Sequence, residues 1–363
     1  MGSAVTDLGK DVLLIFLPMD PDEKWIGRVK STFPGLEIRW VNRDEYAKGG
    51  KSVADIPEEE WRGVTLALVS LPPPAKVMSS VRYVQLSSAG ADRWLEHEVY
   101  KDPNVVFCTA NGVHSPVRTQ IAEWVIGTWL MAQHHFLNFA DFMKTGHWGK
   151  PNNFNIVDSP GLRMGILGYG AIGRQCARLA KALGMEIYAY TRTERSTPES
   201  RKDDSYVVPG TGDPDGVLPD KWFHGASRSA VNDFLAQDLD VLVIGLPLTE
   251  STKYIIDTEQ FDILSRKKTY VVNIARGRHI RTEALIKALE QDKIRGAALD
   301  VTDPEPLPAD HALWQAPNVF ITPHVSWQTP HYWERLLNIL EANLERLRDG
   351  KPMINVMNKE HHY

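Results

Sequence analysis

The chain has 363 residues and a formal net charge of −5 at pH 7, and 43% of its residues are hydrophobic while 24% are charged. This composition is typical of a soluble globular protein. The acidic balance argues against a nucleic-acid partner, which would need a broad basic surface. Because one core rarely serves a chain of this length, we expect two domains.

The cysteines and the apolar spans bear on the compartment in which the protein works. Cys108 and Cys176 show neither a disulfide framework nor metal-ligand spacing, so we expect a reducing compartment, the cytoplasm, and no metal. The most apolar span, residues 121–137, carries one glutamate and two histidines and is interpreted as a buried helix. No secretory signal is visible, and no membrane partner is expected.

The first third of the chain predicts an open α/β domain. Its short apolar runs, bounded by Gly, Pro and Asn, are typical of strands buried on both faces of a parallel sheet. Ligands of such sheets bind beyond the carboxyl ends of the strands, and residues 87–91 (SSAGA) lie at such an end. A short helix is expected over residues 23–33. The strands are expected over residues 11–18, 36–41, 64–70, 83–90 and 104–112.

A long helix that begins near Gln120 separates this part from a second alternation of strands and helices. Each predicted strand ends in polar, Gly or Pro residues, which are typical of loops that cover a cofactor. Gly184 is expected to terminate the helix over residues 171–184. Residues 200–221 are rich in Asp, Gly and Pro and are interpreted as a surface insertion. The strands are expected over residues 163–170, 185–191, 240–249, 269–277, 296–301 and 318–324, with a last helix over 333–347.

Gly168, Gly170 and Gly173 form a G-x-G-x-x-G array between a predicted strand and a predicted helix. In a dinucleotide site the first glycine permits the tight turn, the second admits a pyrophosphate, and the third lets helix and strand pack closely. The pyrophosphate would accept hydrogen bonds from amides near Ala171 and Ile172. Gly-rich turns also join strands to helices without any ligand, but the flanking strand, helix and strand favour the dinucleotide.

The end of the second strand lacks the acidic residue that would bind a ribose 2′-hydroxyl. The chain has Thr191, Arg192 and Thr193 there, with Arg195 close by. A guanidinium binds phosphate oxygens through paired hydrogen bonds, whereas a carboxylate would repel them. An arginine at this position therefore favours NADPH. Glu194 favours NADH instead, because a shift of register would bring its carboxylate to the ribose.

Three residues at later strand ends could form a catalytic group. Arg276 follows one predicted strand, Glu305 follows the next, and His324 ends the last. Singly, each has an ordinary structural interpretation: a surface cation, a solvated loop charge, and a capping or core histidine. Jointly they favour catalysis, because all three are expected at the sheet edge where the cofactor would lie.

In order and spacing, the stretches GILGYGAIG, LPLTESTKYIID, VVNIARG, GAALDVTDPEPLP and NVFITPHVSW resemble the D-isomer-specific 2-hydroxyacid dehydrogenases from about residue 121 to 327. The resemblance implies two Rossmann-like α/β domains, each a mainly parallel sheet flanked by helices, with the active site in the cleft between them. Residues 1–119 and 332–363 would form a flavodoxin-like substrate domain, and residues 120–331 the dinucleotide domain. A homodimer is also implied, with the region 121–137 as a candidate interface.

The resemblance further implies reduction of a 2-keto acid, for example glyoxylate, hydroxypyruvate or a bulkier one, to a D-2-hydroxy acid. The His324 imidazolium would donate the proton, Glu305 would orient that ring and favour its charged form, and Arg276 would bind the substrate carboxylate. Backbone amides of Ser88, Ala89 and Gly90 would hold the other side of the carboxylate. The positions that would border the nicotinamide are Leu246, Pro247, Ile274, Ala275 and Asp300; Asp300 could instead be a strand-end turn residue.

The sequence departs from the family in two places. The segment of residues 200–221 is longer than the family pattern suggests. Ser326 and Trp327 follow His324 at positions where small residues are common. Trp327, Trp333 and Trp94 are therefore candidates to line the pocket, although large aromatic residues are more often part of a core.

Two other functions share this fold. A formate dehydrogenase is one, but formate oxidation needs no proton donor, so a glutamate beside His324 favours carbonyl chemistry. A cofactor-sensing corepressor is the other, and it could retain the same three residues.

Overall fold

The computed structural model describes residues 8–111, 113, 120–152, 154–203 and 210–360. The chain divides into two compact units. Residues 1–113 and 330–363 form the discontinuous unit, and residues 114–329 form the central unit. The chain thus leaves the first unit a few residues before the boundary that the sequence suggested.

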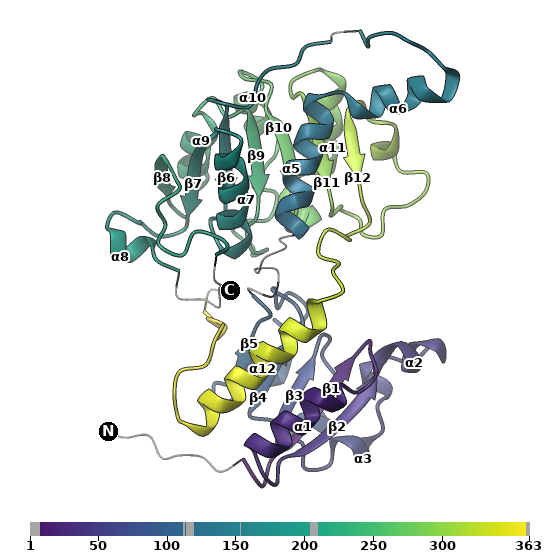
Figure 1. Ribbon diagram of the computed structural model, residues 1–363, viewed down its shortest axis with the longest axis vertical. Helices are drawn as coiled ribbons and strands as arrows, with labels where there is room; N and C mark the ends of the chain where they lie inside the picture. The colour runs from purple at the N-terminus through teal and green to yellow at the C-terminus, as the bar shows by residue number, and fades with distance from the viewer. Residues whose placement is uncertain (1–7, 112, 114–119, 153, 204–209, 361–363) are drawn as a thin grey trace. The chain divides into compact units, whose positions relative to one another are not determined.

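The discontinuous unit is a five-stranded parallel sheet with helices around it (Figure 1). Its strands, in the order β2-β1-β3-β4-β5, are β1 (Val12–Leu17), β2 (Glu37–Asn42), β3 (Leu66–Val69), β4 (Tyr83–Leu86) and β5 (Val106–Cys108). Its helices are α1 (Glu23–Thr32), α2 (Arg43–Lys48), α3 (Glu58–Trp61), α4 (Glu98–Lys101) and α12 (Tyr332–Arg348), with short 3₁₀ turns at η1 (Val53–Asp55) and η2 (Ala75–Met78).

The last helix returns to the sheet that the first third of the chain builds. Figure 1 shows α12, in yellow, beside α1, and the indole of Trp25 donates to the carbonyl of Leu337 at 3.2 Å. Under the helix, the buried Asn343 amide donates to Tyr83 and Gln85 on β4, both at 3.2 Å. Because buried polar groups need partners, these bonds fix where α12 lies.

The central unit is a seven-stranded parallel sheet in the order β12-β11-β10-β9-β6-β7-β8. Its strands are β6 (Arg163–Leu167), β7 (Glu186–Thr191), β8 (Lys221–His224), β9 (Val241–Ile244), β10 (Tyr270–Asn273), β11 (Gly296–Leu299) and β12 (Val319–Ile321). Its helices are α5 (Gln120–Gln133), α6 (Phe136–Thr145), α7 (Ala171–Ala182), α8 (Pro198–Arg201), α9 (Arg228–Leu235), α10 (Thr258–Leu264) and α11 (Thr282–Glu290), with 3₁₀ turns at η3 (Gly277–His279) and η4 (Ala312–Gln315).

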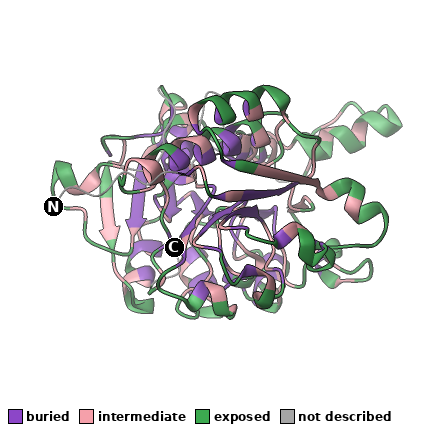
Figure 2. Cartoon of the chain, turned by 90° about the horizontal axis from the view of Figure 1, so that it is seen from below, coloured by how far each residue is buried: buried purple, intermediate pink, exposed green. Residues whose placement is uncertain are grey.

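Apolar cores cover both faces of this sheet, as a parallel sheet requires. Along β9, Leu242 and Ile244 pack with α9, α10 and α11, whereas Val241 and Val243 pack with α5 and α7. Figure 2 shows buried strands in purple between helices whose outer sides are exposed. The predicted fold class, two parallel α/β sheets flanked by helices, is confirmed.

The helix predicted over residues 121–137 is wrong only in its last four residues. Helix α5 ends at Gln133, and His135 has a left-handed backbone with φ of 57°. A residue in that conformation interrupts the helical hydrogen-bond ladder, so the chain turns and begins α6 at Phe136. Phe136 and Leu137 are exposed rather than buried.

Residues 200–221, which the sequence predicted as an insertion, lie mainly in the crossover between two strands. They belong to the connection from β7 to its parallel neighbour β8, a strand that the sequence analysis did not predict. Thr211, Gly212 and Asp213 are buried, which corrects their assignment to the surface. Among the described residues, no helix has the length and apolar character needed to cross a membrane.

Candidate active site

Three polar residues follow three consecutive strands of the central sheet. Arg276 follows β10, Glu305 follows β11, and His324 follows β12. These strands are adjacent and parallel, so their carboxyl ends share one edge, where open α/β sheets bind their ligands. The structure therefore brings the three sequence-predicted residues to the same edge.

His324 and Glu305 are in direct contact. Nδ1 of the imidazole lies 2.8 Å from Oε1 of the carboxylate, and the two side chains are 38% and 41% exposed. An ionised carboxylate can only accept, so Nδ1 carries the hydrogen of this bond and Nε2 is left for proton exchange. A ring oriented in this way has the geometry of a general acid or base.

The loop that carries His324 is wrapped around Asp300, which is only 1% exposed. The Asp300 carboxylate accepts from Thr322 Oγ1 at 2.6 Å, Val325 N at 2.9 Å and Ser326 Oγ at 2.5 Å. The backbone N–H of His324 donates to the Asp300 carbonyl at 2.8 Å. These contacts account for Asp300 as a strand-end turn residue, whereas its contact with a nicotinamide carboxamide stays a prediction.

Arg276 begins the 3₁₀ turn η3 with extended backbone. Its carbonyl accepts from Asn273 Nδ2 at 3.0 Å and lies 3.1 Å from Nδ1 of the buried His279. Its guanidinium is partly exposed and donates to the carbonyl of Ala275 at 2.8 Å. The backbone of the arginine is thus fixed while part of its side chain faces solvent.

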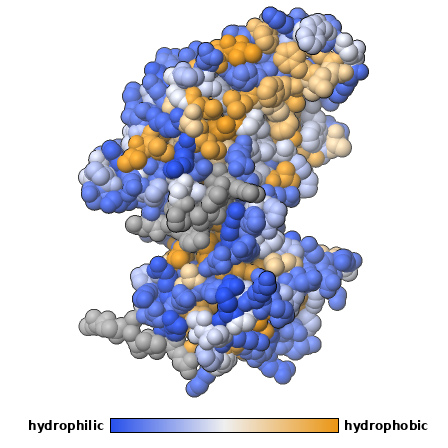
Figure 3. Space-filling model, viewed as in Figure 1, coloured by the Kyte–Doolittle hydropathy of each residue, from blue (hydrophilic) through white to orange (hydrophobic). Residues whose placement is uncertain are grey.

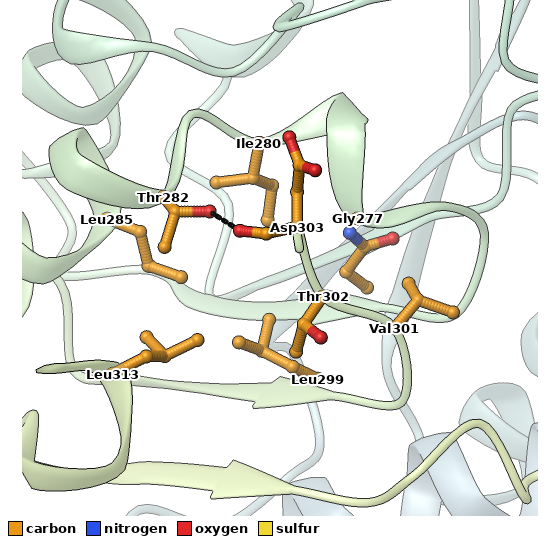
Figure 4. Close-up of a pocket in the computed structure, with 10 residues that line it drawn as sticks. Gly277, Ile280, Thr282, Leu285, Leu299, Val301, Thr302, Asp303 and Leu313 are labelled. Carbon is orange, nitrogen blue, oxygen red and sulfur yellow. Dashed lines mark hydrogen bonds between the residues drawn. The ribbon is translucent and has the colours of Figure 1, made fainter. Parts of the chain in front are cut away.

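The arginine turn packs directly on the segment that leads to the glutamate. A Cβ on Gly277 would lie 1.9 Å from the Thr302 carbonyl oxygen, so no larger residue fits there without moving that segment. Figure 4 shows the small pocket beneath these residues, with Thr282 Oγ1 donating to the Asp303 carbonyl at 2.8 Å. The aliphatic side chains that line it are Ile280, Leu285, Leu299, Val301 and Leu313.

The glycine array has the sterics of a dinucleotide loop. Gly168 has φ of 109°, and a Cβ there would lie 2.7 Å from the Gly245 backbone. A Cβ on Gly173 would lie 2.6 Å from the Gly168 carbonyl oxygen, so only glycine allows α7 to pack this closely. A Cβ on Gly170 would instead meet no atom of the described residues within 4 Å, which leaves the space that a pyrophosphate would need.

The first turn of α7 offers the hydrogen-bond donors. Gly170 is the N-cap and supplies no side-chain cap. The N–H groups of Ala171, Ile172 and Gly173 donate to no other described residue, because the first intrahelical donor is Arg174. Free amides at a helix N-terminus bind phosphate groups, so this chain's residues fit a dinucleotide.

The loop after β7 carries Arg192, a cation that no described residue engages. Arg192 is exposed, and its side chain has no hydrogen bond or ion pair with a described residue. Arg195 instead donates to the Ser200 carbonyl, and Thr191 Oγ1 donates to the Thr193 carbonyl at 2.7 Å. Glu194, the competing residue, is exposed.

The remaining predicted cofactor contacts lie at neighbouring strand ends. Leu246 and Pro247 follow β9, and the Pro247 carbonyl accepts from Thr252 Oγ1 at 2.8 Å. Ile274 and Ala275 follow β10 and are both 8% exposed. They place apolar surface next to the arginine turn.

Ser88, Ala89 and Gly90 belong to the discontinuous unit, where they follow β4. Ser88 Oγ donates to the Gly90 carbonyl at 2.6 Å, which closes a tight turn, and Ala89 is exposed. The Tyr332 hydroxyl of α12 donates to the carbonyl of the preceding Ser87 at 2.5 Å. Their role in substrate binding stays a prediction.

The three tryptophans differ in their surroundings. Trp94 is a core residue of the discontinuous unit, 1% exposed and packed on Phe107, so its proposed place in the pocket is not supported. Trp327 is half-buried and its indole donates to the His324 carbonyl at 2.8 Å. Trp333 is partly exposed and packs edge-on against Tyr332.

Sequence reasoning missed two sets of residues around this edge. Ser326 was noted only as a departure, yet its hydroxyl binds Asp300. Tyr169, between the first two glycines, is buried and donates to Asp213 Oδ2 at 2.8 Å, and burial beside that carboxylate raises the pKa of the Tyr169 phenol well above its usual value. No sequence signal pairs residues so far apart. Among the described residues, no cluster of His, Cys, Asp or Glu is arranged to hold a metal ion.

Comparisons with known proteins agree with this geometry. The model of the D-isomer specific 2-hydroxyacid dehydrogenase NAD binding domain matches residues 126–210 and 218–326. The chain belongs to the D-isomer-specific 2-hydroxyacid dehydrogenase family. It is therefore an oxidoreductase of that family, and its central unit contains the NAD binding domain, so the cofactor is a nicotinamide dinucleotide.

Individual relatives of this dehydrogenase cover most of its length. A glyoxylate reductase from Thermofilum pendens is 30% identical over 252 residues, which is 68% of each chain. A hydroxypyruvate reductase from Blautia hydrogenotrophica is 30% identical over 66% of this chain and 68% of its own. A family member from Xanthobacter autotrophicus Py2, solved in complex with NADPH and MES, superposes with a TM-score of 0.75 at 24% identity, covering 98% of this chain and all of that one; it shows that the two share a fold.

Proposed function

We propose that this dehydrogenase reduces a 2-keto acid to a D-2-hydroxy acid and that it prefers NADPH. The observation that carries the proposal is the 2.8 Å pair of His324 and Glu305, at the sheet edge that also holds Arg276. Reduction of a carbonyl needs a proton donor as well as a hydride, and an imidazole oriented by a carboxylate is suited to that task. Relatives named glyoxylate reductase and hydroxypyruvate reductase suggest small 2-keto acids as the substrate class.

Each residue has a defined part in this reaction. The imidazolium of His324 donates its Nε2 proton to the keto oxygen, and it accepts that proton in the reverse direction. Glu305 holds the ring through Nδ1, and Arg276 binds the carboxylate and polarises the carbonyl. The nicotinamide, when bound, supplies the hydride.

The preference for NADPH depends on Arg192. Its guanidinium is exposed and unengaged by described residues at the end of β7, where the adenosine ribose would lie. An arginine there stabilises a 2′-phosphate by charge and by paired hydrogen bonds. Solved relatives from Xanthobacter autotrophicus Py2 and Sinorhizobium meliloti were crystallised with NADPH and NADP, which supports this choice.

The proposal is tested by following nicotinamide absorbance with glyoxylate, hydroxypyruvate and a bulkier 2-keto acid, each with NADPH and with NADH. We expect turnover of at least one acid and a higher kcat/KM with NADPH. Arg192→Ala should lower the NADPH value roughly tenfold and leave the NADH value unchanged, because only the 2′-phosphate contact is lost. Lys202→Ala, which removes another exposed cation of the same connection, is the control.

The outcomes separate this function from its alternatives. Equal or better use of NADH by the wild type would contradict the cofactor preference. Oxidation of formate, with no reduction of any keto acid, would indicate a formate dehydrogenase. Tight cofactor binding without any turnover would indicate a cofactor-sensing protein.

We also propose that the protein works as a homodimer in the cytoplasm. Support for the dimer comes from an apolar arm, defined here as α6 and residues 147–152 and 154–157, on which Met143 is 82% exposed and Trp148 is fully exposed. Figure 3 shows apolar surface gathered over the side of the central unit where α5 and α6 lie. Exposed apolar surface of this kind marks interaction sites, and a second copy is the simplest partner. The two buried, unpaired cysteine thiols suit a reducing compartment.

A further inference from the structure

The β7–β8 crossover packs along one face of α7. Its described residues are 192–203 and 210–220, and they cover polar side chains that the helix presents at intervals of three or four residues. Gln175 Oε1 accepts from the Gly212 N–H at 2.6 Å, Arg178 Nη1 donates to the Gly212 carbonyl at 3.2 Å, and Lys181 Nζ lies 2.6 Å from Asp220 Oδ2. A helix face that resembles a solvated surface in the sequence is thus an internal interface.

Arg174 is the centre of this interface. It is only 5% exposed although it is charged. Its Nη2 donates to the Arg201 carbonyl at 2.7 Å, its Nη1 donates to the Asp213 carbonyl, and its Nε lies 3.4 Å from Asp203 Oδ2. Because a buried guanidinium is stable only when it is paired and hydrogen-bonded, these partners hold two segments of the crossover, at residues 201–203 and at Asp213, against α7.

Tyr169 joins the same interface to the glycine loop. Its hydroxyl donates to Asp213 Oδ2 at 2.8 Å, and its ring lies 5.1 Å from the Arg174 guanidinium. The Asp213 carboxylate also accepts from the backbone N–H groups of Val217 at 2.9 Å and Leu218 at 3.1 Å. The loop that would hold the pyrophosphate is therefore tied to the middle of the crossover.

The other end of the crossover reaches the loop that carries Arg192. Arg201, whose carbonyl binds Arg174, donates through Nε to the Arg195 carbonyl at 2.9 Å. Arg195 donates back to the Ser200 carbonyl, which closes the loop on α8. An unbroken series of contacts runs from Tyr169 through Asp213, Arg174 and Arg201 to Arg195.

We propose that Tyr169, Arg174 and Asp213 are positioning residues that hold the Arg192 loop at a fixed distance from the glycine loop and so determine the preference for NADPH over NADH. The inference rests on the proposed NADPH-dependent function. Its physical basis is preorganisation: a 2′-phosphate gains most from an arginine that is already in place when the pyrophosphate binds. NADH makes no contact that depends on this spacing, so its affinity should be insensitive to it.

The test compares Tyr169→Phe with Tyr188→Phe. Each removes one hydroxyl that donates to a carboxylate, but Tyr188 lies on β7 and binds Glu186 Oε2 at 3.4 Å, away from the crossover interface. Dissociation constants of NADP⁺ and NAD⁺ are measured by calorimetry on the full chain. We expect Tyr169→Phe to weaken NADP⁺ about tenfold and NAD⁺ less than about twofold, the scale of one charge-assisted hydrogen bond, and Tyr188→Phe to change neither.

Arg174→Lys provides a second variant, since it keeps the charge and loses the planar fork. It should also reduce the ratio of NADP⁺ to NAD⁺ affinity, while melting curves verify that both variants fold. Equal weakening of both cofactors, or no weakening of either, would overturn the positioning role. The proposed function fails separately, if Arg192→Ala leaves NADP⁺ binding unchanged.

Discussion

His324 is held through its backbone as well as through its ring. Its φ of 55° lies in the left-handed region, which non-glycine residues adopt only when their surroundings impose it. The surroundings here are Asp300, whose carboxylate and carbonyl bind the loop on both sides of the histidine, and Trp327, which donates to the His324 carbonyl. The strained backbone directs the ring toward Glu305, so the position of the proposed proton donor depends on Asp300.

His324→Ala should lower kcat for 2-keto acid reduction by about a hundredfold or more, because the proton donor is lost while the cofactor site is unchanged. Steady-state kinetics with saturating NADPH measures the effect. His331→Ala is a matched control, since His331 is also an exposed histidine paired with a carboxylate, Glu334, at 3.3 Å. Near-normal turnover of His324→Ala with cofactor still bound would contradict the assigned role.

Helix α7 is sandwiched, and its two faces use different chemistry. Cys176, Ala177 and Ala180 pack in the apolar cluster shared with α5, while Arg174 and Lys181 face the crossover. The small residues on the first face allow close helix packing. The long cationic residues on the second face reach carbonyl and carboxylate groups of the crossover. The crossover is therefore held mainly by polar contacts, which makes it sensitive to pH.

Asp220 makes that sensitivity measurable. Burial alone would raise its pKa, but the hydrogen bonds from Lys181 and from the Ile187 N–H outweigh burial and lower the pKa of the Asp220 carboxyl below its ordinary value. A carboxyl with a lowered folded-state pKa stabilises the fold above its unfolded-state pKa of about 3.9, and this stabilisation is lost as the pH falls through the folded-state value.

We accordingly expect Asp220→Asn to reduce the melting temperature by about 1–3 °C at pH 7, a small effect because the pair is partly exposed. The difference from the wild type should shrink as the pH is lowered below about 4. Thermal melts across pH 7 to 3.5 measure it, with Asp215→Asn, an exposed aspartate of the same crossover, as the control. A difference that stays constant with pH would refute the charge-based explanation.

Most of the exposed large apolar side chains among the described residues lie on the apolar arm. Met143 and Trp148 lie on the apolar arm, and Gln133 Nε2 and His135 Nε2 donate to carbonyls of Val157 and Asn155, which holds the far end of the arm against the end of α5. Surface of this kind is costly to leave in water. A symmetric dimer would bury the apolar arm of both subunits, because the same patch of each subunit faces the other.

Light scattering after size-exclusion chromatography should therefore give a dimer at micromolar concentration. The double variant Met143→Lys, Trp148→Ser should elute as a monomer, since each subunit would bring one charge into the interface and lose two apolar anchors from it. Val217→Ser, which removes an exposed apolar side chain outside the arm, should remain dimeric. A monomeric wild type, or a double variant that stays dimeric, would disprove the assignment of the arm.

The sequence by itself determined the features that depend on neighbours along the chain. Short apolar runs specified the strands, the spacing of Gly168, Gly170 and Gly173 specified the turn and the close packing of α7, and strand ends located Arg276, Glu305 and His324. Each of these follows from local sterics or from the rule that parallel strands share an edge. The extra strand β8 and the break at His135 were missed, because a four-residue edge strand and a single left-handed residue leave little local signal.

Only the tertiary structure decided which polar groups meet. Tyr169 and Asp213 are 44 positions apart, and Asp300 and Ser326 are 26 apart. Such pairs form because buried donors and acceptors must be satisfied wherever the packed chain brings them together, and many residues of the same type could have served. The residues that would perform the chemistry could therefore be predicted from the sequence, whereas the residues that hold them in position could be identified only in the folded structure.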